Sequence, residues 1–134
     1  MNAFLLNLPQ LKRHSQPWNE LWERSSSWLP PVRAETVLNY VDYFGDQGEF
    51  FAVVVEDDDQ QWVCALPLMI QQKGFMNFGV PLSNPWTFNI DMILDISRIE
   101  RDAEMDAVVQ LLMVALREQK IHALKLDWIE IDNP

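Results

Sequence analysis

The 134-residue sequence is poor in cysteine, glycine and positive charge. A single cysteine excludes a disulfide framework and a zinc site built on paired cysteines. Ten basic residues against twenty acidic ones give a net charge of −10, which repels nucleic-acid phosphates and anionic lipid surfaces. No apolar stretch approaches the roughly 20 residues of a membrane span, and basic residues follow the apolar N-terminal segment, whereas they precede it in a secretory signal. We expect one cytoplasmic domain over residues 1–134.

The residue types that usually carry metal or nucleophilic chemistry are scattered. His14 and His122 are far apart and match no metal-ligand spacing. Cys64 lies in an apolar segment, where we expect a core thiol with a raised pKa. The run Asp57-Asp58-Asp59 lacks the glycine and glutamate of a calcium loop and is predicted to be a solvated hairpin tip. We therefore predict no catalytic residue and no metal site.

Two short helices are predicted before residue 50. The first has Ser15 as its N-cap and ends by residues 25–27, and its apolar face consists of Trp18, Leu21 and Trp22. The second ends at a left-handed cap on Gly45, and its apolar positions are Val37, Leu38, Val41 and Phe44.

The rest of the chain predicts four strands and one long helix. The strands cover about residues 50–56, 61–70, 87–95 and 123–131, with a turn-rich loop before the third. The first two form an antiparallel hairpin, in which Pro67 must lie at a bulge or on the outward side of an edge. A capping box that starts at Ser97 begins a helix over residues 98–119, which buries Val108, Leu112 and Leu116. The fold class is α+β, with a mostly antiparallel central sheet and the long helix on one face.

One turn is a candidate substrate site. Trp86 lies close in sequence to Asn89 and Asp91, so an aromatic ring has hydrogen-bonding groups nearby. Such a combination can hold a polar ligand, for example a sugar or a peptide. Simple packing of the loop is the alternative.

The order and spacing of the elements resemble the first part of a GNAT-type acyltransferase, specifically the FemAB-like and cellulose-biosynthesis (CelD-like) acetyltransferase group. The resemblance is carried by Trp18-Asn19-Glu20-Leu21-Trp22, residues 51–55, Ala65-Leu66-Pro67-Leu68, residues 88–94 and residues 124–129. It implies a GNAT-like fold and acyl transfer to an amine or hydroxyl of a cell-envelope or polysaccharide precursor. A GNAT unit would continue with another helix and two strands, so the resemblance also implies a partial unit.

The segment that should hold the acyl donor departs from the family pattern. GNAT enzymes bind the acyl-CoA pyrophosphate with an R/Q-x-x-G-x-G/A loop between a strand and the following helix, and residues 95–103 at this place contain no glycine. Glycine lets the backbone amides approach the phosphates, because it has no Cβ. Arg98 and Arg101 could attract phosphate, but we expect them to be solvated or paired with neighbouring acids on the helix. The acidic residues that would oppose the pyrophosphate are Asp95, Glu100 and Asp102.

Two hypotheses about function follow. In FemAB-like proteins two GNAT-like halves occur in tandem and the first commonly lacks this loop, so the chain resembles an N-terminal half that needs a C-terminal half for activity and has no cofactor of its own. The alternative is a stand-alone acidic protein-interaction module without catalytic activity. We also expect self-association or partner binding through the sheet edge at residues 123–131, unless Lys125, Asp127 and Glu130 protect that edge.

Overall fold

The computed structural model describes residues 1–25, 33–44, 48–80, 82–84, 87–90, 92–99, 102–121 and 123–124. The helices are α1 (Leu8–Arg13), α2 (Ser15–Arg24), α3 (Ala34–Phe44) and α4 (Asp102–Glu118), with a 3₁₀ helix η2 (Ile96–Arg98). The strands are β1 (Asn2–Leu6), β2 (Glu49–Glu56), β3 (Trp62–Lys73), β4 (Met76–Val80), β5 (Leu82–Asn84), β6 (Thr87–Ile90), β7 (Ile93–Leu94) and β8 (Ala123–Leu124).

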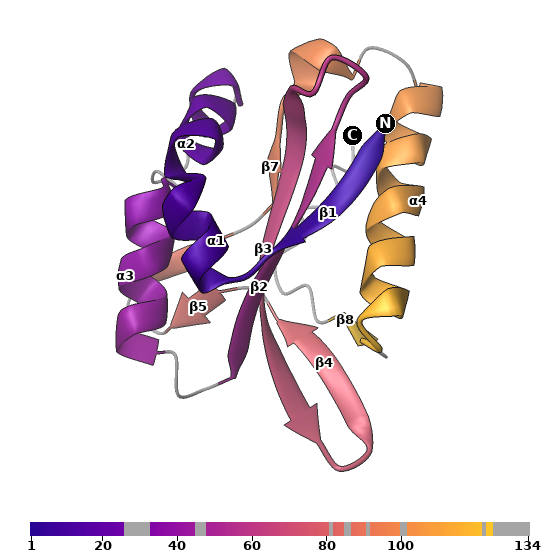
Figure 1. The fold of residues 1–134 in the computed structure, drawn as a ribbon. Helices are drawn as coiled ribbons and strands as arrows, with labels where there is room; N and C mark the ends of the chain where they lie inside the picture. The colour runs from indigo at the N-terminus through magenta and orange to yellow at the C-terminus, as the bar shows by residue number, and fades with distance from the viewer. Residues whose placement is uncertain are drawn as a thin grey trace, which may run out of the picture.

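A central sheet separates two layers of helices (Figure 1). Its strand order is β1-β2-β3-β4-β8, and β7 pairs with β3 beside β4. All of these pairs are antiparallel except β4 with β8, which are parallel. A parallel pair needs a long crossover connection, and α4 lies within it. Helices α1, α2 and α3 lie on one side of the sheet and α4 on the other (Figure 1).

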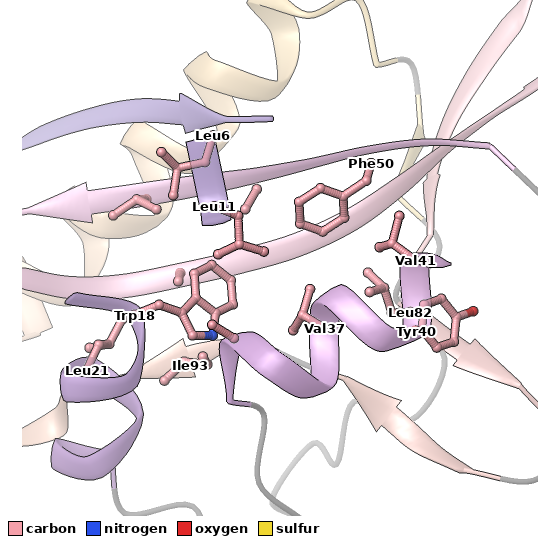
Figure 2. Packing of buried hydrophobic residues seen from close by; sticks show 14 of the residues in the cluster. Leu6, Leu11, Trp18, Leu21, Val37, Tyr40, Val41, Phe50, Leu82 and Ile93 are labelled. Carbon is pink, nitrogen blue, oxygen red and sulfur yellow. The ribbon is translucent and has the colours of Figure 1, made fainter. Parts of the chain in front are cut away.

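Each face of the sheet has its own hydrophobic core. Figure 2 shows the first core, where Trp18 of α2 and Val37 of α3 point toward the sheet. In the second core, α4 packs on the opposite face of β2 and β3 through Val108, Leu112 and Leu116, which confirms the predicted burial of these three residues. Helices cover both faces, which explains why β2 is apolar at nearly every position and not only at alternate ones.

Pro67 lies where β3 has a partner on one side only. A two-residue turn joins β3 to β4 after Lys73, so Lys73 belongs to the closing hydrogen-bonded pair. The backbone N–H and C=O groups of Lys73 therefore face β4. Successive residues of a strand direct these groups to alternate sides, so residues an even number apart direct them to the same side. Pro67 lies six residues before Lys73, and its nitrogen therefore faces the β4 edge and not β2. On that edge the pairing with β4 ends at Met69 and the pairing with β7 ends at Ala65, leaving Pro67 unpaired among the described strands. This agrees with the predicted outward position of the proline.

Several predicted elements are confirmed. Helices α2 and α3 and strands β2 and β3 occur where the sequence indicates, and β2 and β3 form the expected antiparallel hairpin. Cys64 is a buried core residue of β3. The N-cap of α2 is His14, however, and Ser15 is already helical. Gly45 lies outside the described residues.

Other predictions need correction. The expected strand at 87–95 is split: β6 pairs with β5 in a separate small sheet, and only β7 joins the central one. The long helix is described from Asp102. Ser97 lies in the η2 turn and its hydroxyl bonds to Asp95, so it does not cap α4 as predicted. The predicted loop before the third strand contains β4, and β1 and α1 were not predicted at all. Of the expected last strand, the structure describes only β8; residues 125–131 lie outside the described ranges.

No helix in the described ranges is long and apolar enough to span a membrane.

Candidate functional site

The candidate site is the junction that connects β7 to α4, where the family resemblance locates the acyl-donor loop. The chain leaves β7 at Leu94, turns through Asp95 and η2, and reaches the start of α4 at Asp102. The backbone N–H of Asp95 donates to the Val63 carbonyl at 2.9 Å, which continues the pairing with β3 by one residue. The sheet therefore fixes the position of Asp95 at its edge.

The Asp95 carboxylate is fully buried, and both of its oxygens accept hydrogen bonds. Its Oδ1 accepts hydrogen bonds from the Ser97 backbone N–H at 3.2 Å and from the Ser97 hydroxyl at 2.5 Å. Its Oδ2 accepts from Arg24 Nε at 2.9 Å and lies 3.7 Å from Arg98 Nε. A buried carboxylate is stable only when it is paired and hydrogen-bonded, and both conditions are met here.

The two arginines have further partners. Arg24, at the end of α2, also donates from Nη2 to the Trp62 carbonyl at 2.8 Å. Arg98 donates from Nη1 to Asp57 Oδ2 at 2.9 Å. Two guanidiniums and two carboxylates thus form a chain of alternating charge, Arg24–Asp95–Arg98–Asp57, with no net charge.

Asp57 anchors this network to the turn between β2 and β3. Partial burial acts to raise the pKa of Asp57, but hydrogen bonds from the Gln61 N–H, Arg98 and the Asp59 N–H outweigh it, so the pKa is lower than usual. The carboxylate is therefore ionised near neutral pH and holds Arg98 against the turn. Asp58 and Asp59 are exposed, as predicted for a solvated hairpin tip, and Asp58 pairs with the N-terminal ammonium. The prediction needs correction for Asp57, whose side chain is only 19% exposed because it pairs with Arg98.

The described residues of this junction do not fit an acyl-CoA pyrophosphate. A phosphate-binding loop needs free backbone N–H groups and free cationic side chains, but the Ser97 N–H and both guanidiniums already bond to carboxylates of the same chain. The buried Asp95 carboxylate adds negative charge at this position. Glu100 and Arg101, which were also named from the sequence, lie outside the described residues.

The described residues do not test the predicted substrate site. Trp86 and Asp91 lie outside the described residues, and Asn89 belongs to β6, of which only the backbone is described. The site at Trp86, Asn89 and Asp91 therefore stays a prediction. Among the residues that the structure does describe, no group of three or more His, Cys, Asp or Glu side chains could hold a metal ion.

The role of Arg24 was not predicted. Asp95 and Arg98 can be named from the sequence because they lie at the expected position of the cofactor loop. Arg24 precedes Asp95 by 71 residues and belongs to no sequence motif, so the sequence does not indicate the pair. Arg98 pairs with acids, but the expected partners on the helix need correction: Asp95 precedes η2, and Asp57 lies in the distant β2–β3 turn.

Comparison with solved structures shows the same fold. No protein-family model matches the sequence, and no curated protein matches it. A ribosomal-protein-alanine N-acetyltransferase from Brucella melitensis biovar Abortus 2308 is similar in structure, with a TM-score of 0.54 and 11% identity over 98% of this chain and 83% of that chain. An aminoglycoside acetyltransferase from an uncultured soil metagenomic sample has a TM-score of 0.54 and 10% identity over 98% and 81%. A mutant of the BH1408 protein from Bacillus halodurans has a TM-score of 0.52 and 11% identity over 99% and 85%. At these identities the likeness concerns the fold alone, and the fold of this chain is GNAT-like.

Proposed function

We propose that this chain is a GNAT-like unit of a cytoplasmic acyltransferase that does not bind the acyl donor itself, equivalent to the N-terminal half of a FemAB-like tandem enzyme. A second GNAT-like unit would then bind the donor, and the acceptor would be an amine or hydroxyl of a cell-envelope or polysaccharide precursor. The observation that carries the proposal is the buried Asp95 carboxylate, which accepts hydrogen bonds from Arg24 and Ser97 where a GNAT enzyme binds pyrophosphate.

Electrostatic interactions oppose the binding of a pyrophosphate at this junction. A pyrophosphate at this junction would have to displace Asp95 from two arginines or remain beside a buried carboxylate without a counter-charge. Both routes are costly, because a buried charge without its partner is strongly destabilising. The net charge of −10 adds an unfavourable field for a polyanion, screened only beyond about 8–10 Å at ordinary salt.

Thermal melting with millimolar acetyl-CoA tests donor binding. A ligand at 100 times its Kd adds roughly 2.7 kcal/mol to the free energy of unfolding, which for a domain of this size raises Tm by about 10 °C. We expect no such shift. A clear rise in Tm that Arg98→Ala abolishes would show that the junction binds the donor and would overturn the proposal.

The coding sequence that follows Pro134 tests the tandem arrangement. A second GNAT-like unit with an R/Q-x-x-G-x-G/A loop would support the proposal. A stop codon at this position would favour the interaction module.

One observation favours that second candidate, a stand-alone interaction module. Among the described residues, eight large apolar side chains are exposed, and five of them lie at the β3–β4 turn or on α4: Phe75, Met76, Val109, Met113 and Val114. Exposed apolar patches commonly mark surfaces that bind other proteins. An interaction module would retain full function without any acyl donor, whereas an acyltransferase unit would not.

A further inference from the structure

The Asp95 carboxylate is surrounded by donors from two separate elements, α2 and η2. Arg24 comes from the end of α2, and Ser97 and Arg98 come from η2. Oδ1 accepts two hydrogen bonds from Ser97, whereas Oδ2 accepts one from Arg24 and lies within ion-pair distance of Arg98. Both oxygens of one planar carboxylate are thus recognised, which is how proteins bind a carboxylate ligand.

The backbone of this junction is held without the help of the carboxylate. The Asp95 N–H donates to the Val63 carbonyl at 2.9 Å, and the Asp95 carbonyl accepts from the Arg98 N–H at 3.2 Å. Both bonds use only backbone atoms of Asp95, so they remain when its side chain is removed. The sheet edge and the η2 turn therefore keep the Ser97 N–H and hydroxyl in position.

The two guanidiniums are also held by groups other than Asp95. Arg24 Nη2 donates to the Trp62 carbonyl at 2.8 Å, and Arg98 Nη1 donates to Asp57 Oδ2 at 2.9 Å. The side chains of Arg24 and Arg98 are 30% and 38% exposed, so solvent reaches both of them although Asp95 itself is buried. Donors that are already fixed bind a ligand without the cost of ordering them.

The balance of charge at the junction depends on Asp95. With its carboxylate present, two guanidiniums face two carboxylates. Without it, Arg24 and Arg98 face only the carboxylate of Asp57, which leaves one positive charge. This local charge attracts a small anion, because contacts within the site are screened far less than the distant acidic residues of the surface.

We propose that Arg24, Ser97 and Arg98 form a carboxylate-binding site that the chain fills with its own Asp95. Asp95 is then an internal ligand, and a free monocarboxylate such as formate can take its place when the side chain is absent. The site is built by its donors and their other partners and not by its occupant. This inference goes beyond the proposed function, because it needs neither an acyl donor nor a second unit.

Rescue of Asp95→Gly by formate tests the site. This substitution removes the carboxylate and also Cβ, which leaves room for a formate ion. We expect about 0.2 M sodium formate to raise the ratio of folded to unfolded protein at least about tenfold over the same concentration of sodium chloride, as measured by circular dichroism during urea denaturation. Formate binds the folded state, so it also restores structure if the variant is largely unfolded in chloride. A variant that does not respond to formate would overturn the proposal.

The matched control is Asp95→Asn, whose amide fills the same space without a charge. Formate should change the ratio of folded to unfolded protein less than about twofold in this variant and in the wild type. Equal responses of the Gly and Asn variants would show a general salt effect and overturn the proposal. Ser97→Ala in the Asp95→Gly background removes the hydroxyl donor and should weaken the rescue; an unchanged rescue would contradict the assigned donors. Melting with acetyl-CoA tests the proposed function separately, so either proposal can fail alone.

Discussion

Arg24 at the end of α2 forms an ion pair with Asp95, which follows β7: Arg24 Nε lies 2.9 Å from the buried Asp95 Oδ2. Arg24 ends α2 in one helical layer, and Asp95 begins the connection to α4 in the other. Through this pair, the strand-to-helix junction is held by the helix layer on the opposite face of the sheet. A loop that binds a cofactor must accept a ligand, whereas this junction is filled by side chains of the chain itself.

Loss of the Asp95 carboxylate should strongly destabilise the protein. Asp95→Ala leaves Arg24, whose side chain is only 30% exposed, without its counter-charge, and we expect a loss of about 3–5 kcal/mol in the free energy of unfolding. Urea denaturation measures it. The control is Asp58→Ala, which removes an ion pair whose aspartate is 95% exposed and should cost no more than about 1 kcal/mol. Equal losses in the two variants would contradict the structural role of Asp95.

Truncation of Leu112 should open a cavity between α4 and the sheet. Leu112 is buried in the second core, so Leu112→Ala should cost about 2–5 kcal/mol through lost transfer free energy and the cavity. Its neighbour Met113 is 43% exposed, and Met113→Ala should change the stability by about 0.5 kcal/mol or less. A loss below about 1 kcal/mol for Leu112→Ala would show that α4 is peripheral to the fold.

The β2–β3 hairpin and the helices α1 and α2 each have a sequence pattern within their own residues. The β2–β3 hairpin follows from two apolar runs around an acidic turn, and α2 follows from three large residues at helical spacing. Helix α1 also has a local sequence signal, which is its capping pattern and not the spacing of its apolar residues. Asn7 and Gln10 form a capping box, with the Gln10 N–H donating to Asn7 Oδ1 at 2.9 Å. An Asn-x-x-Gln pattern with Pro9 in the first turn predicts this short helix.

The remaining features depend on partners distant in sequence. Alternation at residues 88–94 predicts the extended chain seen in β6 and β7, but not that β6 pairs with β5 and β7 with β3. The Arg24–Asp95 pair likewise has no pattern at either end that indicates the other residue. At the junction, the absence of glycine predicts a departure from the phosphate-binding loop of the family, and Arg24 as the partner of Asp95 is seen only in the structure.

Gly48 should tolerate no side chain at the start of β2. A Cβ at this position would lie 2.4 Å from the Ile70 carbonyl oxygen, which belongs to the backbone of the neighbouring strand and cannot move aside like a flexible side chain. We expect Gly48→Ala to cost about 1–3 kcal/mol through overpacking, measured by urea denaturation. Gly74→Ala is the comparison, because its Cβ would meet no atom within 4 Å but its φ of +63° remains strained; it should cost about 1–2 kcal/mol. A neutral Gly48→Ala would show that β2 and β3 can separate there.

The Cys64 thiol should be unreactive in the folded protein and should make stability fall at alkaline pH. Burial in β3 raises the pKa of Cys64 to about 12 from its ordinary value of 9.0, so almost no thiolate forms in the folded state at pH 8. In the unfolded chain the thiol ionises near its ordinary pKa. The folded-state pKa is the higher one, so the stability contribution is fully present below about pH 9 and is lost as the pH rises from there toward 12.

We expect a thiol reagent to label Cys64 at pH 8 only after urea unfolding. Between pH 9 and 10.5 the free energy of unfolding should fall more steeply for the wild type than for Cys64→Ala, which lacks the titrating group. Rapid labelling without denaturant, or the same pH dependence of the free energy of unfolding in the two proteins, would show that the thiol is accessible and that the two faces of β3 are not both covered.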